Sequence, residues 1–333
     1  MGLVSIGVDI GGTFTKLLKK VGNKIVAKET IKTKTNNGLL AVLEAISSFC
    51  AINGINTRKR RNTDEFVMGI SSPGIWGVIN DEQTVIGNCF NLPWLLNCHL
   101  ISDIQTQFGI KAYGLNDAKL QIYGQCAFGR AIGSKVAVGL TLGTGIGGAV
   151  VINGKIFLGA HGHAGELGHI SISQGYHARK CNCGNVGCLE AYAGTAGFLR
   201  TVRECVAIQG SGQLEKVDMT DIKKIFSLAK KHPEINSSCL SAVKETSKYL
   251  AHGLSGLLLA FNPDALIFDG QISRDTEFFW PFIETELQKI LSQKQVLEKL
   301  KIVPSSDPEF SGALGAAAYA EARHRGEDVV MSW

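Results

Sequence analysis

The chain has 333 residues, a net charge of +5, and 45% hydrophobic against 19% charged residues. Its length suggests two domains, and its apolar content is enough for a sizeable core, which excludes a wholly disordered protein. It has no apolar run of the ~18 residues that a membrane span needs, and its start lacks the pattern of a secretory signal. We therefore expect a cytoplasmic protein that does not act at a membrane.

Basic residues are spread along the chain, apart from one short run at residues 58–61. Asp64 and Glu65 follow this run closely, which favours a solvated loop over a patch for nucleic acid. Nine cysteines are an odd number for a closed set of disulfides, so most should be reduced thiols. The chain has 39 glycines among its 333 residues, which is a larger share than the average of ~7%. So many glycines indicate tight turns or close approaches of the backbone to a ligand.

The first part of the chain is rich in strand patterns. Residues 4–10, 14–19 and 24–29 follow one another at short spacing, which predicts an antiparallel meander. Residues 38–50 carry apolar side chains at helical spacing. Residues 66–70 read as a further strand that ends at a Ser-Ser-Pro-Gly turn.

A similar pattern starts again later, where residues 135–142 and 149–152 read as strands on either side of a Gly-rich turn. Strand, Gly-rich turn and strand thus occur twice, which suggests two related domains. Residues 237–261 predict a long helix that Asn-Pro ends, and residues 265–269 predict a buried strand. Residues 314–325 predict a last helix, whose early part is small enough for close packing.

No low-complexity linker separates the two halves, and we place the domain boundary near residue 115. The expected domains are a smaller α/β domain over 1–115 and a larger α/β domain over 116–311. A C-terminal helix over about 312–333 could return to the first domain.

The turn after the first strand has the composition of an anion site. Gly11 and Gly12 permit positive φ angles that point N–H groups at an anion, and Thr13 adds a hydroxyl. Lys16 could add a positive charge. Asp9 would repel a phosphate unless a cation lay between them, which predicts Mg²⁺. The alternative is an ordinary glycine hairpin with an exposed Asp9.

Residues 143–148 repeat this chemistry, beginning with Gly143, Thr144 and Gly145. A strand follows the turn, whereas the dinucleotide fingerprint requires a helix there, so we exclude a Rossmann site. The P-loop motif is also missing. Two Gly-Thr turns in two similar domains suggest a nucleotide held across a cleft.

Three thiols lie within eight residues, at Cys181, Cys183 and Cys188, and His169 lies twelve residues upstream of the first. Three cysteines and one histidine form a closed, structural zinc site, and thiolates argue against Mg²⁺ or Ca²⁺. The alternative is a group of reduced surface thiols. Three other histidines leave the fourth ligand open: His161, His163 and His177.

Several carboxylates are candidates for chemistry. Asp117 lies between a short strand (residues 111–115) and a helix (118–128), where it could accept a proton from a substrate hydroxyl. The alternative role of Asn116 and Asp117 is to cap this helix.

Glu166 and Glu190 flank the cysteine segment among glycines. They would present acceptors to sugar hydroxyls, or could simply be exposed. Together with Asp117 they would repel an acidic substrate.

Four motifs occur in one order: Asp9-Ile-Gly-Gly-Thr13, Leu142-Gly-Thr-Gly-Ile-Gly-Gly148, Gly165-Glu-Leu-Gly-His169 and Cys181-x-Cys183-Gly-x-x-Gly-Cys188-x-Glu190. This order resembles the ROK family (repressors, open reading frames and sugar kinases) over nearly the whole chain. The resemblance implies an α/β protein with two related domains of the actin-like ATPase (ribonuclease H-like) type and a cleft between them. It also implies ATP and Mg²⁺ as cofactors, a structural Zn²⁺, and a homodimer.

The resemblance assigns roles to individual residues. Asp117 matches the catalytic base, and His169 matches the fourth zinc ligand. Residues that match sugar contacts are Asn91, Asn116, Glu166, His169 and Glu190. Gly270 matches a glycine on the nucleotide side, although Asp269 stands where the family usually has another glycine. Lys119 and Gln125 also depart from the family's pattern on the helix after Asp117.

The expected reaction is transfer of the ATP γ-phosphoryl group to the 6-hydroxyl of a neutral hexose, with glucose first. N-acetylmannosamine or N-acetylglucosamine comes second, and fructose, allose or a β-glucoside stay open. A sugar-sensing repressor is disfavoured because Asp9 lies too near the start of this sequence to leave room for a helix-turn-helix. A catalytically inactive sugar-binding protein is disfavoured by the intact Asp9, Thr13 and Asp117.

Overall fold

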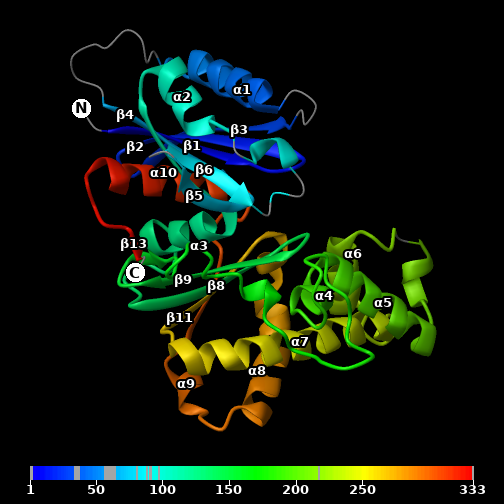
Figure 1. The fold of residues 1–333 in the computed structure, drawn as a ribbon. Coiled ribbons are helices and arrows are strands. Elements are labelled where there is room, and N and C mark those ends of the chain that lie inside the picture. Colours follow the sequence, from blue (N-terminus) through cyan, green and yellow to red (C-terminus); the bar gives the residue numbers. More distant parts are fainter. Residues whose placement is uncertain are drawn as a thin grey trace. The chain divides into compact units, whose positions relative to one another are not determined.

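The computed structural model describes residues 3–33, 38–55, 65–79, 82–87, 89, 92–96, 98–216 and 218–331. Asn91 and the basic run at 58–61 lie outside these residues. The chain forms two compact units (Figure 1). The first consists of Met1–Ser134, Ala149–Gly165 and Ser306–Trp333, and the second of Lys135–Gly148 and Glu166–Ser305. This division differs from the predicted boundary near residue 115, because the strand and helix around Asp117 pack within the first unit.

The first unit is built on a five-stranded sheet with the order β3-β2-β1-β4-β7. The strands are β1 (Val4–Ile10), β2 (Phe14–Val21), β3 (Lys24–Lys32), β4 (Phe66–Ser72) and β7 (Lys111–Asn116). β1, β2 and β3 form the predicted antiparallel meander, whereas β4 runs parallel to β1 and β7 parallel to β4. Every residue of β1 is buried, as expected for a strand with both faces covered.

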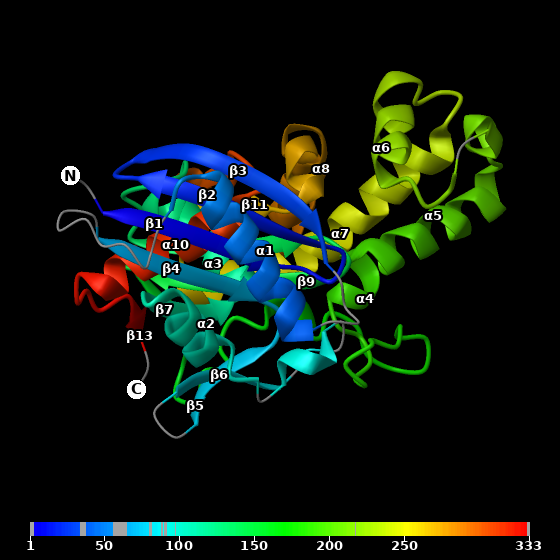
Figure 2. The ribbon, with the colours of Figure 1, turned by 90° about the horizontal axis from the view of Figure 1, so that it is seen from above.

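Helices cover both faces of this sheet (Figures 1 and 2). They are α1 (Gly38–Ile52) and α2 (Leu100–Phe108) on one face, and α3 (Asp117–Ala127) and α10 (Ser311–His324) on the other. α10 lies very close to the sheet, because a Cβ on Gly7 or on Gly69 would come within 1.8 Å of a carbonyl oxygen of this helix. The run of small residues predicted for this helix therefore serves a tight contact.

Smaller elements complete the first unit. They are the hairpin β5 (Ile75–Ile79) and β6 (Glu82–Gly87), the 3₁₀ turn η2 (Pro93–Leu95), β9 (Ile146–Ile152), β10 (Lys155–Phe157) and β13 (Val330–Met331). β10 pairs with β9 and with β13, and β9 begins in the second unit.

In the second unit, β11 (Ala265–Asp269) pairs in parallel with β8 (Val136–Leu142) and with β12 (Lys301–Pro304), and every residue of β11 is buried. The helices are α4 (Glu190–Ala193), α5 (Thr195–Gln209), α6 (Ile222–Lys231), α7 (Ser237–Phe261), α8 (Thr276–Ile290) and α9 (Gln295–Glu298). Three 3₁₀ turns join them: η3 (Leu167–His169), η4 (Gly212–Lys216) and η5 (Gln271–Asp275). α7 has the predicted bounds; it ends where Asn262 takes a left-handed conformation before Pro263.

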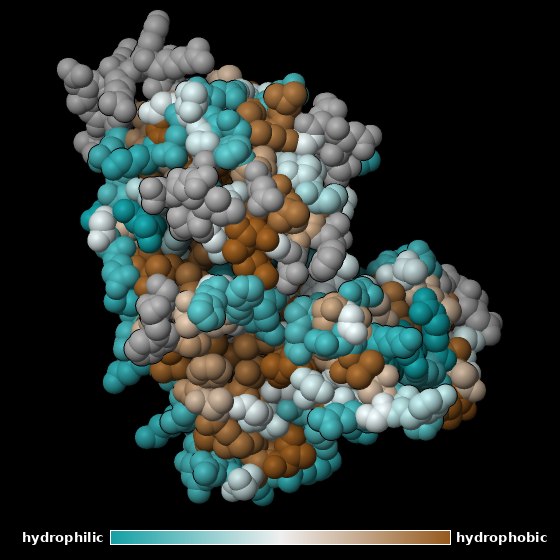
Figure 3. All heavy atoms as spheres, in the orientation of Figure 1, coloured by the Kyte–Doolittle hydropathy of each residue, from teal (hydrophilic) through white to brown (hydrophobic). Residues whose placement is uncertain are grey.

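All nine cysteines lie in described parts of the chain, and none of them forms a disulfide. No helix in the described residues has the length and apolar character to cross a membrane. Hydrophilic and hydrophobic side chains are interspersed on the face seen in Figure 3.

Candidate functional site

Asp9 occupies the carboxyl end of β1, where it is buried. The Ser71 hydroxyl donates to its Oδ1 over 2.6 Å, and Lys16 stands opposite it in the β1–β2 register. Burial raises the pKa of Asp9, while the Ser71 hydrogen bond and the charge of Lys16 act in the opposite direction. A buried carboxylate with so little compensation suits a bound cation, so Asp9 fits the predicted role beside Mg²⁺.

Asn116 and Asp117 lie where β7 ends and α3 begins. The Asn116 side chain accepts a hydrogen bond from the Lys119 N–H over 3.2 Å, and so caps the helix. Its amide also donates to the Gly74 carbonyl over 3.1 Å. Oδ1 of Asp117 accepts from the Ala118 N–H over 2.8 Å. Asn116 thus fulfils the capping alternative and fixes the backbone from which the half-buried Asp117 projects.

The sheet places Asp9 and Asp117 at the same edge. In the register of the parallel strands, Asp9 is opposite Ser71 on β4, and Ser72 is opposite Asn116 on β7. Strands two places apart are separated by about 10 Å. The carboxyl ends of β1, β4 and β7 therefore present two carboxylates on one side of the sheet, as ligand sites in α/β proteins commonly do.

Two hydrogen bonds hold the turn between β1 and β2 in place. The Gly11 N–H donates to the Phe14 carbonyl over 3.0 Å, and the Thr33 hydroxyl donates to the Gly11 carbonyl over 2.8 Å. Gly11 and Gly12 are both described, and neither has the positive φ that the sequence suggested. Gly12 and Thr13 are exposed, with N–H groups that no described residue accepts, so they remain available to an anion.

The turn between β8 and β9 is anchored differently. Its Gly143 carbonyl accepts from the N–H and the hydroxyl of Thr195 at the start of α5. The Ile146 N–H donates to the Glu190 carboxylate over 2.8 Å. A Cβ on Gly145 would fall 2.2 Å from Oε2 of Glu190, which explains this glycine by close approach and not by a positive φ.

Gly270 follows β11 with a φ of 87°. A Cβ there would lie 2.4 Å from the Leu142 carbonyl oxygen, so both conformation and space require glycine. Asp269 is fully buried, and its carboxylate accepts from the Gly270 N–H over 2.5 Å. Asp269, which departs from the family's second glycine, thus stiffens this turn.

The four predicted zinc ligands converge in the second unit. One ligand atom from each of His169, Cys181, Cys183 and Cys188 lies within 4.8 Å of all the others. The Cys183 and Cys188 sulfurs are 3.7 Å apart, as are the Cys181 sulfur and Nδ1 of His169. A zinc–sulfur bond of 2.3 Å implies tetrahedral edges of about 3.8 Å, so the donor set and spacing both fit Zn²⁺. Within the described residues, the three histidines left open by the sequence do not join this cluster.

Two glycines shape the cysteine loop. Gly184 and Gly187 have φ angles of 94° and 81°, and a Cβ on Gly187 would lie 1.8 Å from the Ser173 carbonyl oxygen. An isolated β-bridge between Lys180 and Val186 closes the loop. The glycines therefore allow the sharp folding that the motif predicted.

Glu190 lies between the cysteine cluster and the Gly-rich turn. Its Oε1 lies 3.6 Å from the Cys181 sulfur while its Oε2 holds the Ile146 N–H. Glu166 is half-buried at the start of η3, and its carbonyl accepts from the His169 N–H over 3.1 Å. Glu190 thus lies in contact with a cysteine of the cluster, and Glu166 bonds through its backbone to His169 of the cluster.

The predicted residues fall into two groups, one in each unit. The first unit holds Asp9, Gly11, Gly12, Thr13, Lys16, Asn116 and Asp117. The second unit holds Gly143, Thr144, Gly145, Glu166, His169, Cys181, Cys183, Cys188, Glu190 and Gly270.

Sequence reasoning missed two supporting residues. Ser71 looked like part of a turn, whereas β4 extends to Ser72 and points the Ser71 hydroxyl at Asp9. Thr195 carried no motif, although it holds the Gly143 carbonyl. Two serines at the end of a predicted strand could have indicated that Ser71 lies near the site. Nothing in the sequence around Thr195 indicates its contact with Gly143.

Residues 5–323 of the chain match the model of the ROK family. The sequence is 32% identical over 324 residues to a glucokinase from Thermotoga maritima, covering 96% of this chain and 97% of that protein. The chain belongs to the ROK family.

Relatives within the family include repressors. The chain is 27% identical to a xylose repressor from Caldicellulosiruptor bescii over 94% of its own length and 77% of the repressor's.

The structure is similar to that of a ROK family glucokinase from Streptomyces griseus, solved with glucose and AMPPNP. The TM-score is 0.75 and the sequence identity 24%, over 96% of this chain and 99% of that one. The fold is thus the two-domain α/β actin-like ATPase fold of ROK sugar kinases.

Proposed function

We propose that this chain is a sugar kinase that transfers the γ-phosphoryl group of ATP to the 6-hydroxyl of a neutral hexose, with glucose as the first choice. One observation carries the proposal: Asp9 and Asp117 lie at the carboxyl ends of strands in one sheet. Asp9 is buried and accepts a hydrogen bond from Ser71, as suits a carboxylate that faces a cation. Asp117 is the first residue of α3, whose start is fixed by hydrogen bonds. Similarity to a glucokinase over nearly the full length of both chains supports it.

Asp117 acts as the general base in this proposal. It accepts the proton of the sugar hydroxyl as that oxygen attacks the γ-phosphorus. Because the transition state is loose, most of the rate enhancement comes from positioning and from neutralising charge. Asn116 contributes by fixing the backbone at the end of β7.

The phosphates bind at the two glycine turns. The N–H groups of Gly12 and Thr13 on one turn, and those of Thr144 and Gly145 on the other, are the donors we assign to them. Lys16 adds a positive charge. Asp9 is the residue that would hold Mg²⁺, which neutralises phosphate charge when bound.

Two further expected residues, Gly143 and Gly270, shape these turns and donate no hydrogen bond to the phosphates in this proposal. Gly143 gives its carbonyl to Thr195, and Gly270 permits the close approach of its loop to β8.

The sugar contacts are Asn91, Asn116, Glu166, His169 and Glu190 in this proposal. Carboxylates accept hydrogen bonds from hydroxyl groups and repel anions, which accounts for a neutral substrate. A structural Zn²⁺ on the Cys181, Cys183, Cys188 and His169 cluster would keep Glu190 in place beside Gly145. We further propose a cytoplasmic homodimer.

An ATP-consumption assay with a panel of sugars tests the proposal. We expect ADP release that depends on sugar, with the highest kcat/KM for glucose and lower values for N-acetylmannosamine, N-acetylglucosamine, fructose and allose. A higher kcat/KM for an N-acetylhexosamine would replace glucose while keeping the kinase. Sugar binding without ADP release would instead indicate an inactive sugar-binding or sensing protein.

A further inference from the structure

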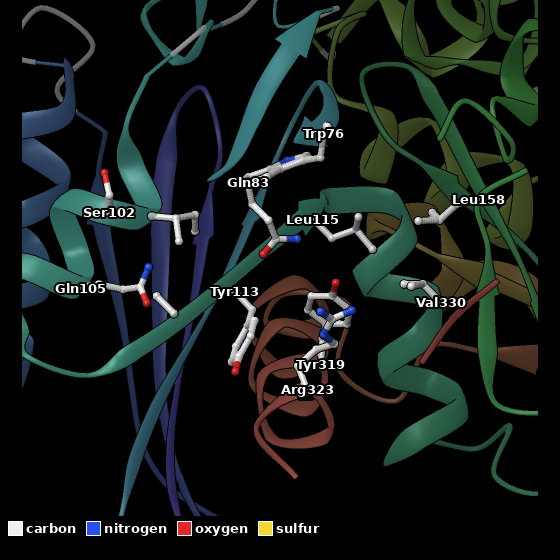
Figure 4. Close-up of a pocket in the computed structure, with 13 residues that line it drawn as sticks. Trp76, Gln83, Ser102, Gln105, Tyr113, Leu115, Leu158, Tyr319, Arg323 and Val330 are labelled. Carbon is white, nitrogen blue, oxygen red and sulfur yellow. The ribbon is translucent and has the colours of Figure 1, made fainter. Parts of the chain in front are cut away.

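A cavity of about 640 Å³ lies in the first unit at the outer edge of β7 (Figure 4). Its volume is within the range of small-molecule sites. α2, the β5–β6 hairpin, β7, α10 and the segments around β10 and β13 supply its walls. None of the residues assigned above to ATP, sugar or metal lines it.

One wall of the cavity is apolar and aromatic. Trp76 is only 8% exposed, and its indole packs so closely on β7 that a Cβ on Gly114 would lie 2.2 Å from the ring. Leu115, Leu158 and Val330 add aliphatic surface. Nε1 of Trp76 is buried and has no hydrogen-bond partner among the described residues. Less than 1 Å² of this atom is accessible, so Trp76 presents the apolar surface of its ring to the cavity and not its N–H group.

The opposite wall carries a single charge. Arg323 is the only charged residue among the described residues that line the cavity. Its guanidinium lies 5.8 Å from the centre of the Tyr113 ring, and it forms no ion pair with a described carboxylate. The nearby Asp328 pairs with Lys155 instead. Figure 4 shows Arg323 and Tyr319 rising from α10 toward Leu115 and Gln83.

The polar groups of Gln83 are already engaged. Its amide exchanges two hydrogen bonds with the backbone of Gly114, at 3.2 and 3.3 Å. Gln83 thereby satisfies the backbone of Gly114 on β7. Arg323 is left as the one charged group of the described lining, and it has no ion pair there.

We propose that this cavity binds a small organic anion in which a carboxylate or phosphate is attached to a ring. Arg323 takes the anionic group, since guanidinium pairs with planar carboxylates and with phosphates. The ring lies against Trp76 and the aliphatic side chains. A sugar phosphate and an aromatic carboxylate both have this chemistry.

The cavity is joined to the proposed catalytic residues by two elements. Leu115, in its wall, directly precedes Asn116 at the end of β7 and Asp117 at the start of α3. α10 carries Arg323 near its end, while a Cβ on Gly312 near its start would lie 2.5 Å from Cγ of Asp9. We therefore assign the cavity as an effector site whose occupancy changes turnover, and this second step rests on the proposed function.

Calorimetric titration tests the binding step without any turnover. The probes are benzoate, its uncharged analogue benzamide, D-glucose 6-phosphate and inorganic phosphate. We expect benzoate or D-glucose 6-phosphate to bind with a Kd below about 1 mM, and benzamide and inorganic phosphate at least tenfold more weakly. The probe that binds identifies the source of the anion. Arg323→Gln should weaken this binding at least tenfold, whereas Arg325→Gln, an exposed arginine outside the lining, should not.

Tryptophan fluorescence provides a second readout. Ligand binding should change the emission of the wild type, and the change should disappear in Trp76→Phe. The proposal is overturned if neither ring anion binds, or if Arg323→Gln binds the same probe as tightly as the wild type. The latter result would place the probe elsewhere, including at the proposed sugar site in the case of D-glucose 6-phosphate.

Kinetics test the coupling step. A saturating ring anion should change kcat or KM at least twofold in the wild type and in Arg325→Gln, but not in Arg323→Gln. Arg323-dependent binding with unchanged kinetics would overturn the effector role. A protein that phosphorylates no sugar but binds a ring anion through Arg323 would refute the proposed function and the effector role, and leave the binding site standing.

Discussion

Asp9 and Asp117 are both carboxylates at strand ends, yet the protein supports them differently. Asp9 is buried against a serine hydroxyl, and burial raises its pKa. Asp117 is half-buried and starts a helix. The first environment suits a carboxylate that faces a cation, and the second a carboxylate that must reach a substrate proton.

Asp117→Asn should lower kcat by about 10²- to 10⁴-fold, the usual contribution of a general base. Asparagine can still accept the Ala118 N–H, so the start of α3 should persist and sugar affinity should stay within several-fold. Coupled kinetics and calorimetry with glucose measure the two effects. Near-full activity of the purified variant would remove Asp117 from the role of base.

Ser71→Ala should weaken the support of Asp9, because the buried carboxylate loses its hydroxyl donor. We expect a loss of about 1–3 kcal/mol in the free energy of unfolding and a raised KM for Mg²⁺-ATP. Ser72→Ala is the matched control, since the Ser72 hydroxyl bonds to the Pro73 carbonyl. Equal effects of the two substitutions on KM would contradict a specific role for Ser71.

The sequence pointed to residues that belong to compact motifs. Asp9, Asp117 and the three cysteines could be named because their neighbours along the chain carry the signal, whereas His169 was chosen among four histidines only through the family resemblance. Ser71 could not, because its role arises from the pairing of β4 with β1, which brings together residues 62 positions apart. Local composition also suggested positive φ at Gly11 and Gly145, whereas close approach to neighbouring atoms explains these glycines.

Among the elements, α3 and α10 make an unusually close crossing. A Cβ on Gly315 of α10 would lie 1.8 Å from the Leu120 carbonyl oxygen of α3. This distance is far shorter than a van der Waals contact. Because the Leu120 carbonyl belongs to the backbone of α3, it cannot move aside unless the helix shifts. The helix that begins at Asp117 is therefore positioned by a glycine far away in the sequence.

Gly315→Ala should destabilise the protein by about 1–3 kcal/mol, since added atoms in a tight crossing displace backbone. Gly256→Ala is the matched control, because Gly256 lies inside α7 with no atom within 4 Å of its added Cβ. We expect this second change to stabilise by up to about 1 kcal/mol through helix propensity. Urea denaturation of both variants gives the comparison, and a neutral Gly315→Ala would refute the close crossing.

Elements that turn residues end clearly were predicted well from the sequence. β1, α7 and β11 have the predicted bounds. α10 begins at Ser311, three residues before the predicted start, because its first turn is made of small residues whose burial against Asp9 the sequence does not show. The β5–β6 hairpin left no clear signal, since its strands are short and cover only the edge of the sheet.

For the whole molecule, the cluster of His169 and three cysteines is a source of stability separate from the hydrophobic core. The exposed Cys183 and the buried Cys181 and Cys188 would together hold a metal beside Glu190. A structural metal contributes its binding energy to folding, so its removal should be felt beyond the loop.

Cys181→Ser should reduce bound zinc from about one ion per chain to near none and lower Tm by about 5 °C or more, at roughly 2 °C for each kcal/mol lost. Cys205→Ser is the control, since Cys205 lies outside the cluster. Elemental analysis and calorimetry give both readouts. A metal-free sample with unchanged melting would count against the zinc proposal.

The place of α10 in the first unit has a consequence for biosynthesis. This helix covers β1 and β4, yet its residues leave the ribosome only after those of the entire second unit. Until then the nascent chain carries an uncovered apolar sheet face, the kind of surface that attracts chaperones and promotes aggregation during translation. A stalled nascent chain that ends before Ser306 should therefore be cleaved by protease within β1–β4, while release of the finished polypeptide should bring protection.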